Sequence, residues 1–445
     1  MRLGERLDRF LSVGALAARV YVGYKAIGLA ERRLGLRDAD SRRSHHHTWS
    51  AQRLYDLAVR RQGLLIKFGQ VVGSRPDLMP DEYIQVLSRL QDQVPPRPFG
   101  VIRRRVERSL GRPLSDVFAE FDPQPIAAAS LAQVHRARLR KRPRTRVGDD
   151  GWDGRDVAVK VQYPGIEAIV REDLRNIAFL VRILAKLERT LDLTPLLQEM
   201  SQNVPLELDF INEGHNAEMI ARNFTGRDDI IVPRIVWEYT TRRVLTMEYT
   251  DGIKITDVEA MRAAGIDPQA VAQLVSDVYC EQLFLHGMFH ADPHPGNLFV
   301  RPGPRLVMLD FGLCRQYDDR FRLGYARLCH AMFSFDMAAM VEAFRDLGVR
   351  LKRPSDTSTY VVLGRSFLET SAPGRAYADA DLVAEANQRI MRAVRANPIV
   401  EVPRELLLIM RVTGLLSGLG KRLDSRVDVV NTILPYTKAA LEGAA

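Results

Sequence analysis

Two short segments in the second half of this 445-residue chain carry side chains that could hold a metal ion against a polyphosphate. The first covers residues 290–297 and contains Asp292 and Asn297, and the second begins with Asp310. Apolar residues and a turn separate them, so both are expected on loops beside short strands. Magnesium prefers a few hard oxygen ligands and keeps the rest of its shell for water and phosphate oxygens. The two carboxylates and the amide therefore predict a site for magnesium and a polyphosphate.

The spacing of these residues matches the metal-binding loops of protein kinases. A kinase catalytic loop places its catalytic Asp five positions before a metal-binding Asn, and an Asp-Phe-Gly segment follows on the next hairpin. Asp292 and Asn297 have this spacing, and Asp310 begins a literal Asp-Phe-Gly. An Asp-Phe-Gly alone is common, but both elements in this order are specific. Asp292 is the candidate catalytic residue, and Asn297 and Asp310 are the candidate magnesium ligands.

A valine-rich segment upstream, residues 157–160, is typical of a strand and ends in Lys160. A lysine on a buried strand needs an anionic partner, and nucleotide phosphates together with a helix glutamate supply one. The tetrapeptide is weak by itself, because lysines at strand ends are commonly exposed. Lys160 is the candidate phosphate-binding lysine.

An alanine-rich segment stands where a kinase would have its glycine-rich phosphate loop. Alanine lets backbone N–H groups approach a phosphate, but it resists the positive φ angles that glycine supplies. The segment therefore predicts a stiffer loop, and the alternative is a small-residue turn packed against a neighbour. The candidate nucleotide-contacting residues are Ile126, Ala127, Ala128, Ala129, Ser130, Leu131, Ala132, Gln133 and Val134.

The composition, with 46% apolar and 27% charged residues, is that of a soluble globular protein and excludes wholesale disorder. The length suggests two or three folded units. Three scattered cysteines argue against a disulfide scaffold, so a reducing, cytoplasmic location is expected. A basic run at residues 136–146 lacks interleaved aromatic residues, so no nucleic-acid partner is expected. The sequence leaves the oligomeric state open.

The first 48 residues supply much of the net charge of +9, with ten Lys or Arg against five Asp or Glu. Residues 10–30 are largely apolar but are interrupted by Arg19 and Lys25. A spanning helix wants about 20 mostly apolar residues, so we expect this segment not to cross a bilayer. It could instead lie on an anionic membrane surface as a peripheral amphipathic helix, or pack on its own protein.

Hydrophobic periodicity predicts a helical preface, a small lobe with strands and a larger helical lobe. Residues 54–72 carry one apolar helical stripe, and residues 132–139, 156–162, 230–236 and 243–247 are the predicted strands. The prediction is an α+β fold in four parts: a basic segment 1–48, a helical extension 49–122, a strand-containing lobe 123–250 and a helical lobe 251–445.

In these motifs the chain resembles the UbiB/AarF family of atypical protein-kinase-like proteins, from about residue 54 to about residue 312. The family's Lys-x-Gly-Gln signature appears between Lys67 and Gln70, and Ser-Arg-Pro-Asp follows at residues 74–77 and Leu-Gln-Asp at residues 90–92. The alanine-rich loop and a Glu-x-Asp signature, Glu207 to Asp209, complete the pattern with the catalytic segment. The resemblance implies a bilobal protein-kinase-like fold with a helical N-terminal extension.

The resemblance also implies ATP and Mg²⁺ as cofactors. Residues 247–250 are similar to a kinase hinge, where the backbone near Glu248 and Thr250 would hold the adenine edge. Lys160 would bind the ATP phosphates, residues 126–134 would form the nucleotide loop, and residues 292, 297 and 310 would take the catalytic and metal-binding roles described above. Glu199 and Glu207 both qualify as the helix partner of Lys160, and spacing does not choose between them.

Lys67 and Gln70 share one side of a helix because three positions separate them. In the family this helix packs over the site where a kinase would admit a protein substrate, with Lys67 pairing toward Glu207 and Asp209. The chain also has no Ala-Pro-Glu segment after Asp310. The resemblance therefore argues against ordinary protein phosphorylation.

We predict an atypical kinase or ATPase that binds Mg-ATP between two lobes and hydrolyses it or phosphorylates a small or lipid-like acceptor. The resemblance implies an isoprenoid or lipid ligand and a role in isoprenoid-quinone synthesis or membrane lipid handling. The alternative is a nucleotide-responsive lipid-binding or scaffold protein with little turnover. The chain keeps Asp292, Asn297, Asp310 and Lys160, and this favours an active kinase or ATPase over a scaffold protein.

Overall fold

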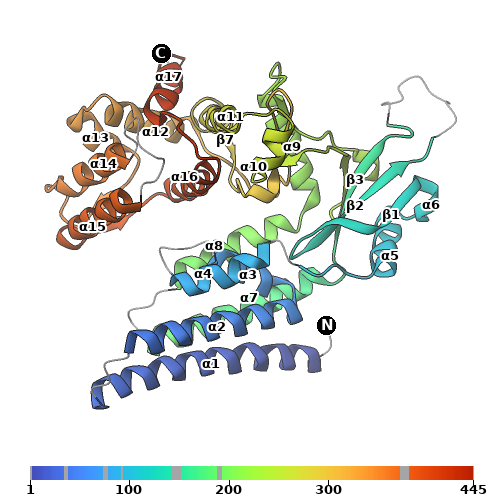
Figure 1. Cartoon of the computed structure of the whole chain (residues 1–445), viewed down its shortest axis with the longest axis horizontal. Helices are drawn as coiled ribbons and strands as arrows, with labels where there is room; N and C mark the ends of the chain where they lie inside the picture. Colours follow the sequence, from blue (N-terminus) through green and yellow to red (C-terminus); the bar gives the residue numbers. More distant parts are fainter. Residues whose placement is uncertain are drawn as a thin grey trace. The chain divides into compact units, whose positions relative to one another are not determined.

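The computed structural model describes residues 3–34, 39–73, 79–91, 94–141, 152–187, 193–370 and 380–443 (Figure 1). Residues 74–77, Asp92 and most of the basic insertion at 138–155 lie outside this part of the chain. The chain divides into two compact units, Met1–Gly214 with Arg234–Tyr249, and His215–Pro233 with Thr250–Ala445. The predicted α+β class and the helical N-terminal extension are confirmed.

The first unit combines a helical layer with one antiparallel sheet. Its helices are α1 (Leu3–Leu34), α2 (Ala39–Arg61), α3 (Leu64–Val72), α4 (Asp81–Leu87), α5 (Phe99–Leu110), α6 (Leu114–Val117), α7 (Ile166–Leu187), α8 (Thr194–Glu207) and the start of α9 (Phe210–Asn223). Its strands are β1 (Phe118–Ala128), β2 (Ala132–Leu139), β3 (Asp156–Gln162) and β5 (Val244–Glu248), which pair in the order β1-β2-β3-β5. The predicted strands at 132–139 and 156–162 are confirmed, and the prediction at 243–247 is one residue early.

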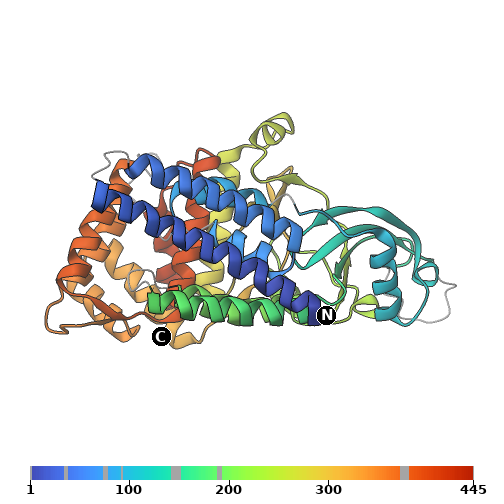
Figure 2. The same ribbon diagram turned by 90° about the horizontal axis from the view of Figure 1, so that it is seen from below.

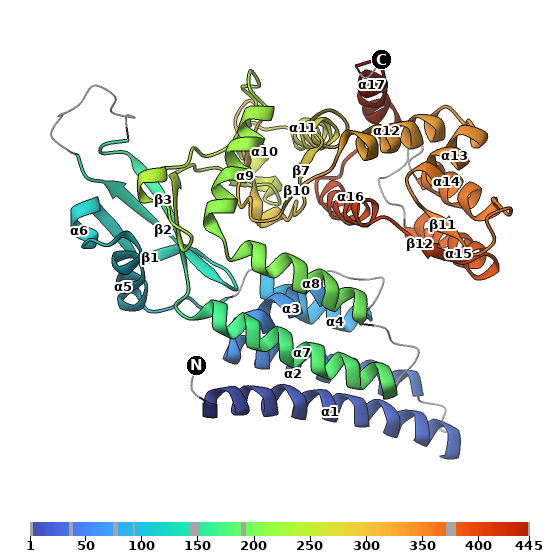
Figure 3. The ribbon, with the colours of Figure 1, turned by 180° about the vertical axis from the view of Figure 1, so that it is seen from behind.

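Strand β3 presents valines to one side of the sheet and a lysine to the other. Val157, Val159 and Val161 are fully buried in a core that includes side chains of α5 and α7. Side chains alternate along a strand, so Lys160 points away from that core. Figure 3 shows α5 and α6 beside the sheet. Burial of each valine contributes about 1.5–3 kcal/mol, which fixes the register that places Lys160 opposite Val134 and Leu245.

The alanine-rich segment is a tight hairpin rather than an extended loop. Ile126 lies in β1 near the end of that strand, and the hairpin is closed where Ala129 N–H donates to the carbonyl of Ala132 at 2.8 Å. Ala132 then begins β2. Gln133 is fully buried, and its Oε1 accepts a hydrogen bond from the backbone N–H of Arg97 at 2.8 Å. The expected nucleotide loop is therefore mostly strand, and Gln133 has a structural partner.

Helices α1, α2 and α7 run side by side (Figure 2). The stripe predicted at residues 54–72 is confirmed as a core position, since Leu57, Leu65 and Val72 are buried in one cluster. Arg9 of α1 is also buried, and its Nη2 donates to Asp173 Oδ2 on α7 at 2.6 Å. A buried charge is tolerated only when it is paired, so this contact fixes α1 on α7. Through this face α1 packs on α7 of its own protein.

The opposite face of α1 is apolar and exposed. Leu7, Leu11, Val22 and Leu29 expose between 52% and 62% of their surface, and their spacing places them on one side of the helix. Within the described residues, α1 is the one helix whose length and composition would let it cross a membrane, over Gly4–Glu31. The most apolar eighteen-residue window of that stretch contains no buried residue. Attachment of this face to a membrane stays a prediction.

The second unit is mainly helical, and its described residues form three small sheets. Its helices are the rest of α9, α10 (Val258–Ala263), α11 (Pro268–Cys280), α12 (Asp319–Phe333), α13 (Met337–Asp346), α14 (Ser358–Thr370), α15 (Ala380–Ala396), α16 (Arg404–Arg422) and α17 (Val429–Glu442). Strands β4 (Ile230–Ile231), β9 (Arg305–Met308), β8 (Leu298–Arg301) and β6 (Ile253–Lys254) form one sheet in that order. Strand β7 (Met288–His290) pairs with β10 (Cys314–Gln316), and β11 (Arg350–Leu351) pairs with β12 (Ile399–Glu401). The strand predicted at 230–236 is wrong beyond its first two residues.

Candidate active site

The lysine of β3 forms a buried ion pair with the first turn of α9. Lys160 Nζ lies 2.7 Å from Glu213 Oε1, and the two side chains are only 12% and 2% exposed. The same ammonium group lies 5.4 Å from the centre of the Phe210 ring. Glu213 was not predicted, because the sequence pointed to Glu199 or Glu207 instead. Glu207 pairs elsewhere, and the side chain of Glu199 lies outside the described residues.

The sequence does contain a signal for Glu213. Phe210, Ala217 and Ile220 are buried, and Glu213 occupies the same face of α9 by helical spacing. A carboxylate in the middle of an apolar helix face needs a buried cation. A search for such a residue after the Glu-x-Asp signature would have selected Glu213 as the partner of the strand lysine.

The predicted Lys-x-Gly-Gln and Glu-x-Asp signatures meet within the first unit. Lys67 Nζ on α3 lies 2.8 Å from Glu207 Oε1, in agreement with what the resemblance implies. Gln70 Nε2 donates to the carbonyl of Leu90 at 2.9 Å. Asp209 pairs with Arg242 at 3.0 Å, and no motif in the sequence marks this arginine.

The predicted hinge begins at the end of β5. The backbone N–H of Glu248 donates to the carbonyl of Arg234 at 2.8 Å, and its side chain lies 3.4 Å from the Arg234 guanidinium. Any backbone contact from Glu248 to a ligand must therefore use its carbonyl oxygen. Thr250 is the first residue of the next segment and belongs to the second unit.

The three predicted catalytic and metal-binding residues come together in the second unit. Asn297 Nδ2 donates to the carbonyl of Asp292 at 3.2 Å, and the backbone N–H of Leu309 donates to the carbonyl of Asn297 at 2.8 Å. These bonds place Asn297 between the loop of Asp292 and the residue that precedes Asp310. Because Nδ2 is a donor in this bond, Oδ1 of Asn297 is the atom that could bind a cation. An amide oxygen is one of the hard oxygen ligands that suit the shell of Mg²⁺.

His290 holds the Asp-Phe-Gly backbone in place. It is fully buried, and its Nε2 lies 2.7 Å from the carbonyl oxygen of Asp310. A carbonyl oxygen can only accept, so Nε2 carries the proton and Nδ1 accepts from the Tyr279 hydroxyl at 3.3 Å. Burial, together with the charge of Asp292, raises the pKa of Tyr279 well above its ordinary value, which keeps this donor protonated. His290 therefore ties strand β7 to the Asp-Phe-Gly backbone.

Asp310 itself has a left-handed backbone, with φ of 60°, a conformation that is uncommon for residues other than glycine. Two contacts hold the segment in this conformation. Its Oδ1 accepts from the Gly312 N–H at 3.3 Å, and Asn216 Nδ2 donates to the carbonyl of Phe311 at 2.9 Å. Hydrogen bonds from neighbouring residues thus stabilise the unfavourable backbone conformation that orients the Asp310 carboxylate, as at many functional sites.

An arginine from the C-terminal part of the chain faces the candidate catalytic residue. Arg411 Nη2, on α16, lies 4.0 Å from Asp292 Oδ1. In the sequence Arg411 interrupts the apolar run 406–419, and no motif marks it. Its position inside an apolar helix was the available signal, since such a charge commonly has a specific partner.

Comparisons with known proteins bear on these assignments. The family described as "ABC1 atypical kinase-like domain" matches residues 89–344, a range that includes Lys160, Glu213, Asp292 and Asp310. The AarF domain-containing protein kinase 1 of Xenopus tropicalis is 36% identical over 404 residues, covering 88% of this chain and 74% of that protein. The chain belongs to the ABC1/AarF family of atypical kinases. The resemblance stated from the motifs is confirmed.

Other relatives extend the comparison. The chloroplastic protein ACTIVITY OF BC1 COMPLEX KINASE 8 of Arabidopsis thaliana is 33% identical over 87% of this chain, which spans 53% of that protein. The solved structure of Rv3197 from Mycobacterium tuberculosis, in complex with erythromycin, has a TM-score of 0.59 and 22% identity, and it covers 82% of this chain and 89% of that one. This likeness shows that the fold is shared. The kinase-like enzyme class predicted for the chain is supported by the names of its relatives.

The ion pair generates a direct test. Glu213→Gln should lower the free energy of unfolding by about 3 kcal/mol, because Lys160 then loses its buried carboxylate. The double variant Glu213→Gln, Lys160→Met should be more stable, by at least about 1 kcal/mol, than the sum of the two single effects predicts. Urea unfolding measures both quantities. As a control, the effects of Glu207→Gln and Lys160→Met on the free energy of unfolding should add. A larger departure from additivity for Glu207 with Lys160 than for Glu213 with Lys160 would contradict the assignment.

Proposed function

We propose that the protein binds Mg-ATP and either hydrolyses it or transfers its γ-phosphoryl group to a small or lipid-like acceptor. The observation that carries the proposal is the buried pair of Lys160 and Glu213 on β3 and α9. Kinase-like phosphate sites use a strand lysine held by a helix glutamate in this way. Within the second unit the proposal takes support from Asn216, which donates to the carbonyl of Phe311 and so holds the Asp-Phe-Gly backbone.

Each proposed role follows from charge and position. Lys160 offsets the negative charge of the nucleotide phosphates, and Asn297 with Asp310 would hold the magnesium ion. When bound, the ion neutralises charge on the transferred phosphoryl group. Asp292 accepts a hydrogen bond from the water or acceptor hydroxyl and orients it for in-line attack. Most of the rate enhancement then comes from positioning and electrostatic stabilisation.

Two segments of the first unit are proposed to contact the nucleotide. The β1–β2 hairpin, residues 126–134, is exposed at Ala127 and Ala129, whose small side chains permit close approach of a phosphate. The carbonyl oxygen of Glu248 and the backbone at Thr250 would hold the adenine edge. The side chain of Gln133 takes no part in this proposal, since it is buried against residue 97.

The proposed acceptor is small or lipid-like rather than a peptide. The support is the pairing of Lys67 with Glu207, which ties α3 to the end of α8, together with the family resemblance. Quinone synthesis or membrane lipid handling is the proposed pathway, and an isoprenoid or lipid is the proposed ligand. Mass spectrometry of a lipid extract from the purified protein would identify a co-purifying isoprenoid, and a protein free of any lipid would count against this class.

We further propose a cytoplasmic protein attached to membranes through the exposed face of α1. Leu7, Leu11 and Val22 lie on that face, and Arg19 and Lys25 supply positive charge on the same helix. Apolar burial combined with attraction to anionic headgroups is what holds interfacial helices on membranes.

Asp310→Asn should abolish the magnesium-dependent part of ATP binding, a loss of about tenfold or more, because the amide removes the charge that the cation needs. Isothermal titration of ATP with and without magnesium measures it. Asp336→Asn is the matched control, since Asp336 caps α13 and Asn caps a helix equally well. Unchanged magnesium dependence in Asp310→Asn would contradict the metal assignment.

Arg411→Met should lower kcat for ATP turnover by about tenfold to a hundredfold while leaving KM for ATP within about twofold. The methionine keeps an apolar stem but cannot pair with Asp292, so the carboxylate loses orientation and not nucleotide contact. Steady-state kinetics separates the two parameters. An equal rise in KM with unchanged kcat would show that Arg411 does not act through Asp292.

The triple variant Leu7→Ser, Leu11→Ser, Val22→Ser should reduce co-sedimentation with anionic liposomes by about tenfold or more, since each leucine or valine contributes about 1.5–3 kcal/mol on burial. It keeps the buried pair of Arg9 and Asp173, which deletion of the segment would break. Val400→Ser removes an equally exposed apolar side chain from the second unit and serves as the control. Equal sedimentation of the triple variant and the control would remove the membrane role from α1.

A further inference from the structure

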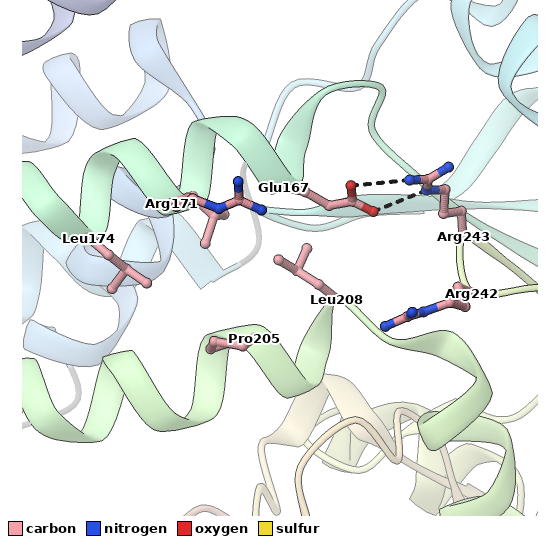
Figure 4. Close-up of a pocket in the computed structure, with 8 residues that line it drawn as sticks. Glu167, Arg171, Leu174, Pro205, Leu208, Arg242 and Arg243 are labelled. Atoms are coloured by element: carbon pink, nitrogen blue, oxygen red, sulfur yellow. Dashed lines mark hydrogen bonds and ion pairs between the residues drawn. The ribbon is translucent and has the colours of Figure 1, made fainter.

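A pocket of about 390 Å³ opens between α7 and α8, entirely within the first unit (Figure 4). Small-molecule sites commonly have volumes from about 300 to 1,000 Å³. The pocket combines two kinds of wall. One wall is apolar and the other is rich in arginine. The residues that line the pocket are Glu167, Val170, Arg171, Leu174, Pro205, Leu208, Arg242 and Arg243.

The charged wall has more cations than carboxylates. Glu167 accepts two hydrogen bonds from Arg243, at 3.0 and 3.2 Å. Arg242 pairs with Asp209 but leaves 76% of its side chain exposed. Arg171 has no ion-pair partner among the residues that the structure describes, and it is exposed on α7. A guanidinium group has five N–H donors, so Arg171 and Arg242 can both donate to one more acceptor.

The apolar wall selects the kind of anion. Leu174 and Leu208 are partly buried against the core, and their remaining surface lines the pocket beside Pro205. A simple anion would leave this surface in contact with water, and an uncharged apolar compound would leave Arg171 unused. Two arginines on different elements require several acceptor oxygens, which a phosphate monoester provides. The walls together therefore fit a phosphate monoester that carries an apolar chain.

The pocket wall is also bonded to the elements that hold Lys160. Gln162, two residues after Lys160 on β3, donates from Nε2 to the carbonyl of Leu208 at 3.0 Å and from its backbone N–H to the carbonyl of Arg243 at 3.0 Å. The backbone N–H of Phe210, at the start of α9, donates to the carbonyl of Arg242 at 3.3 Å. A ligand that draws Arg242 away from Asp209 therefore pulls on a turn whose backbone is bonded to β3 and to α9. These two elements carry Lys160 and Glu213, the residues of the buried ion pair.

We propose that this pocket binds a phosphate monoester with an apolar chain, and that its occupation changes the affinity of the Lys160 site for nucleotide. The first part is independent of the nucleotide chemistry, and the second rests on the proposed function. Binding free energies are reciprocal, so Mg-ATP must change the affinity for the phosphate monoester by the same factor.

The test uses octyl phosphate as the probe, titrated calorimetrically into the full chain without nucleotide or magnesium. It should bind once per chain and saturate. Methyl phosphate and octyl glucoside should each bind at least about tenfold more weakly, because each supplies only the head or only the chain. Equal binding of octyl glucoside and octyl phosphate would overturn the site.

Arg171→Gln should weaken octyl phosphate binding by at least about fivefold, and adding Arg242→Gln should weaken it further. Arg175→Gln is the matched control, because Arg175 is an exposed arginine on the same helix that pairs with Glu172 outside the pocket. Its affinity for the probe should stay within about twofold of the wild type. An unchanged dissociation constant in the Arg171→Gln, Arg242→Gln double variant would overturn the site.

The coupling is tested by titrating Mg-ATP with and without saturating octyl phosphate. A change of about threefold or more, matched by the reverse titration, supports the coupling. Equal ATP affinities in the two titrations would overturn it. A protein that binds octyl phosphate but no ATP would contradict the proposed nucleotide function and leave the pocket assignment standing.

Discussion

The structure of the first unit depends on a buried ammonium group that must be neutralised. Two buried charges are costly to remove from water, and the pair of Lys160 and Glu213 persists only if β3 and α9 are held at a fixed separation. The valines of β3 anchor the strand in the core, and pairing with β2 and β5 sets its register. The backbone bonds from Gln162 and Phe210 to the turn before β5 connect the strand and the helix. The fold thus presents one cation with little freedom to move.

The segment from residue 207 to residue 213 is a junction of three ion pairs. Glu207 pairs with α3, Asp209 with the turn before β5, and Glu213 with β3. Each acid faces a cation from a different element, so the end of α8 and the start of α9 are fixed from three sides. In the second unit His290 has the comparable role, since it ties the loop before Asp292 to the backbone of Asp310. Local sequence motifs therefore mark positions where ion pairs or hydrogen bonds connect elements that are distant in the sequence.

Much of this was predictable from the sequence, and the rest was not for physical reasons. Strand β3 and the loops of Asp292 and Asp310 were predicted because alternation and spacing are local properties. Strand β1 was missed because it contains the turn formers Asp122, Pro123 and Pro125, and the pairing of Phe121 and Pro125 with β2 on either side of an irregularity keeps the segment in the strand. Glu213 and Arg411 were missed because each becomes meaningful only through a partner far along the chain. Spacing along the chain gives no information about such a partner.

We propose that Lys160 binds the phosphates of a nucleotide and that Asp310 holds its magnesium ion. The most direct measurement uses ATP that carries a biotin acyl phosphate, which transfers biotin to a lysine beside the terminal phosphate, followed by mass spectrometry of the labelled peptides. We expect magnesium-dependent labelling of Lys160 in the wild type and its loss in Asp310→Asn. Labelling of Lys160 that is unchanged by Asp310→Asn, or labelling that falls on Lys67 instead, would contradict it.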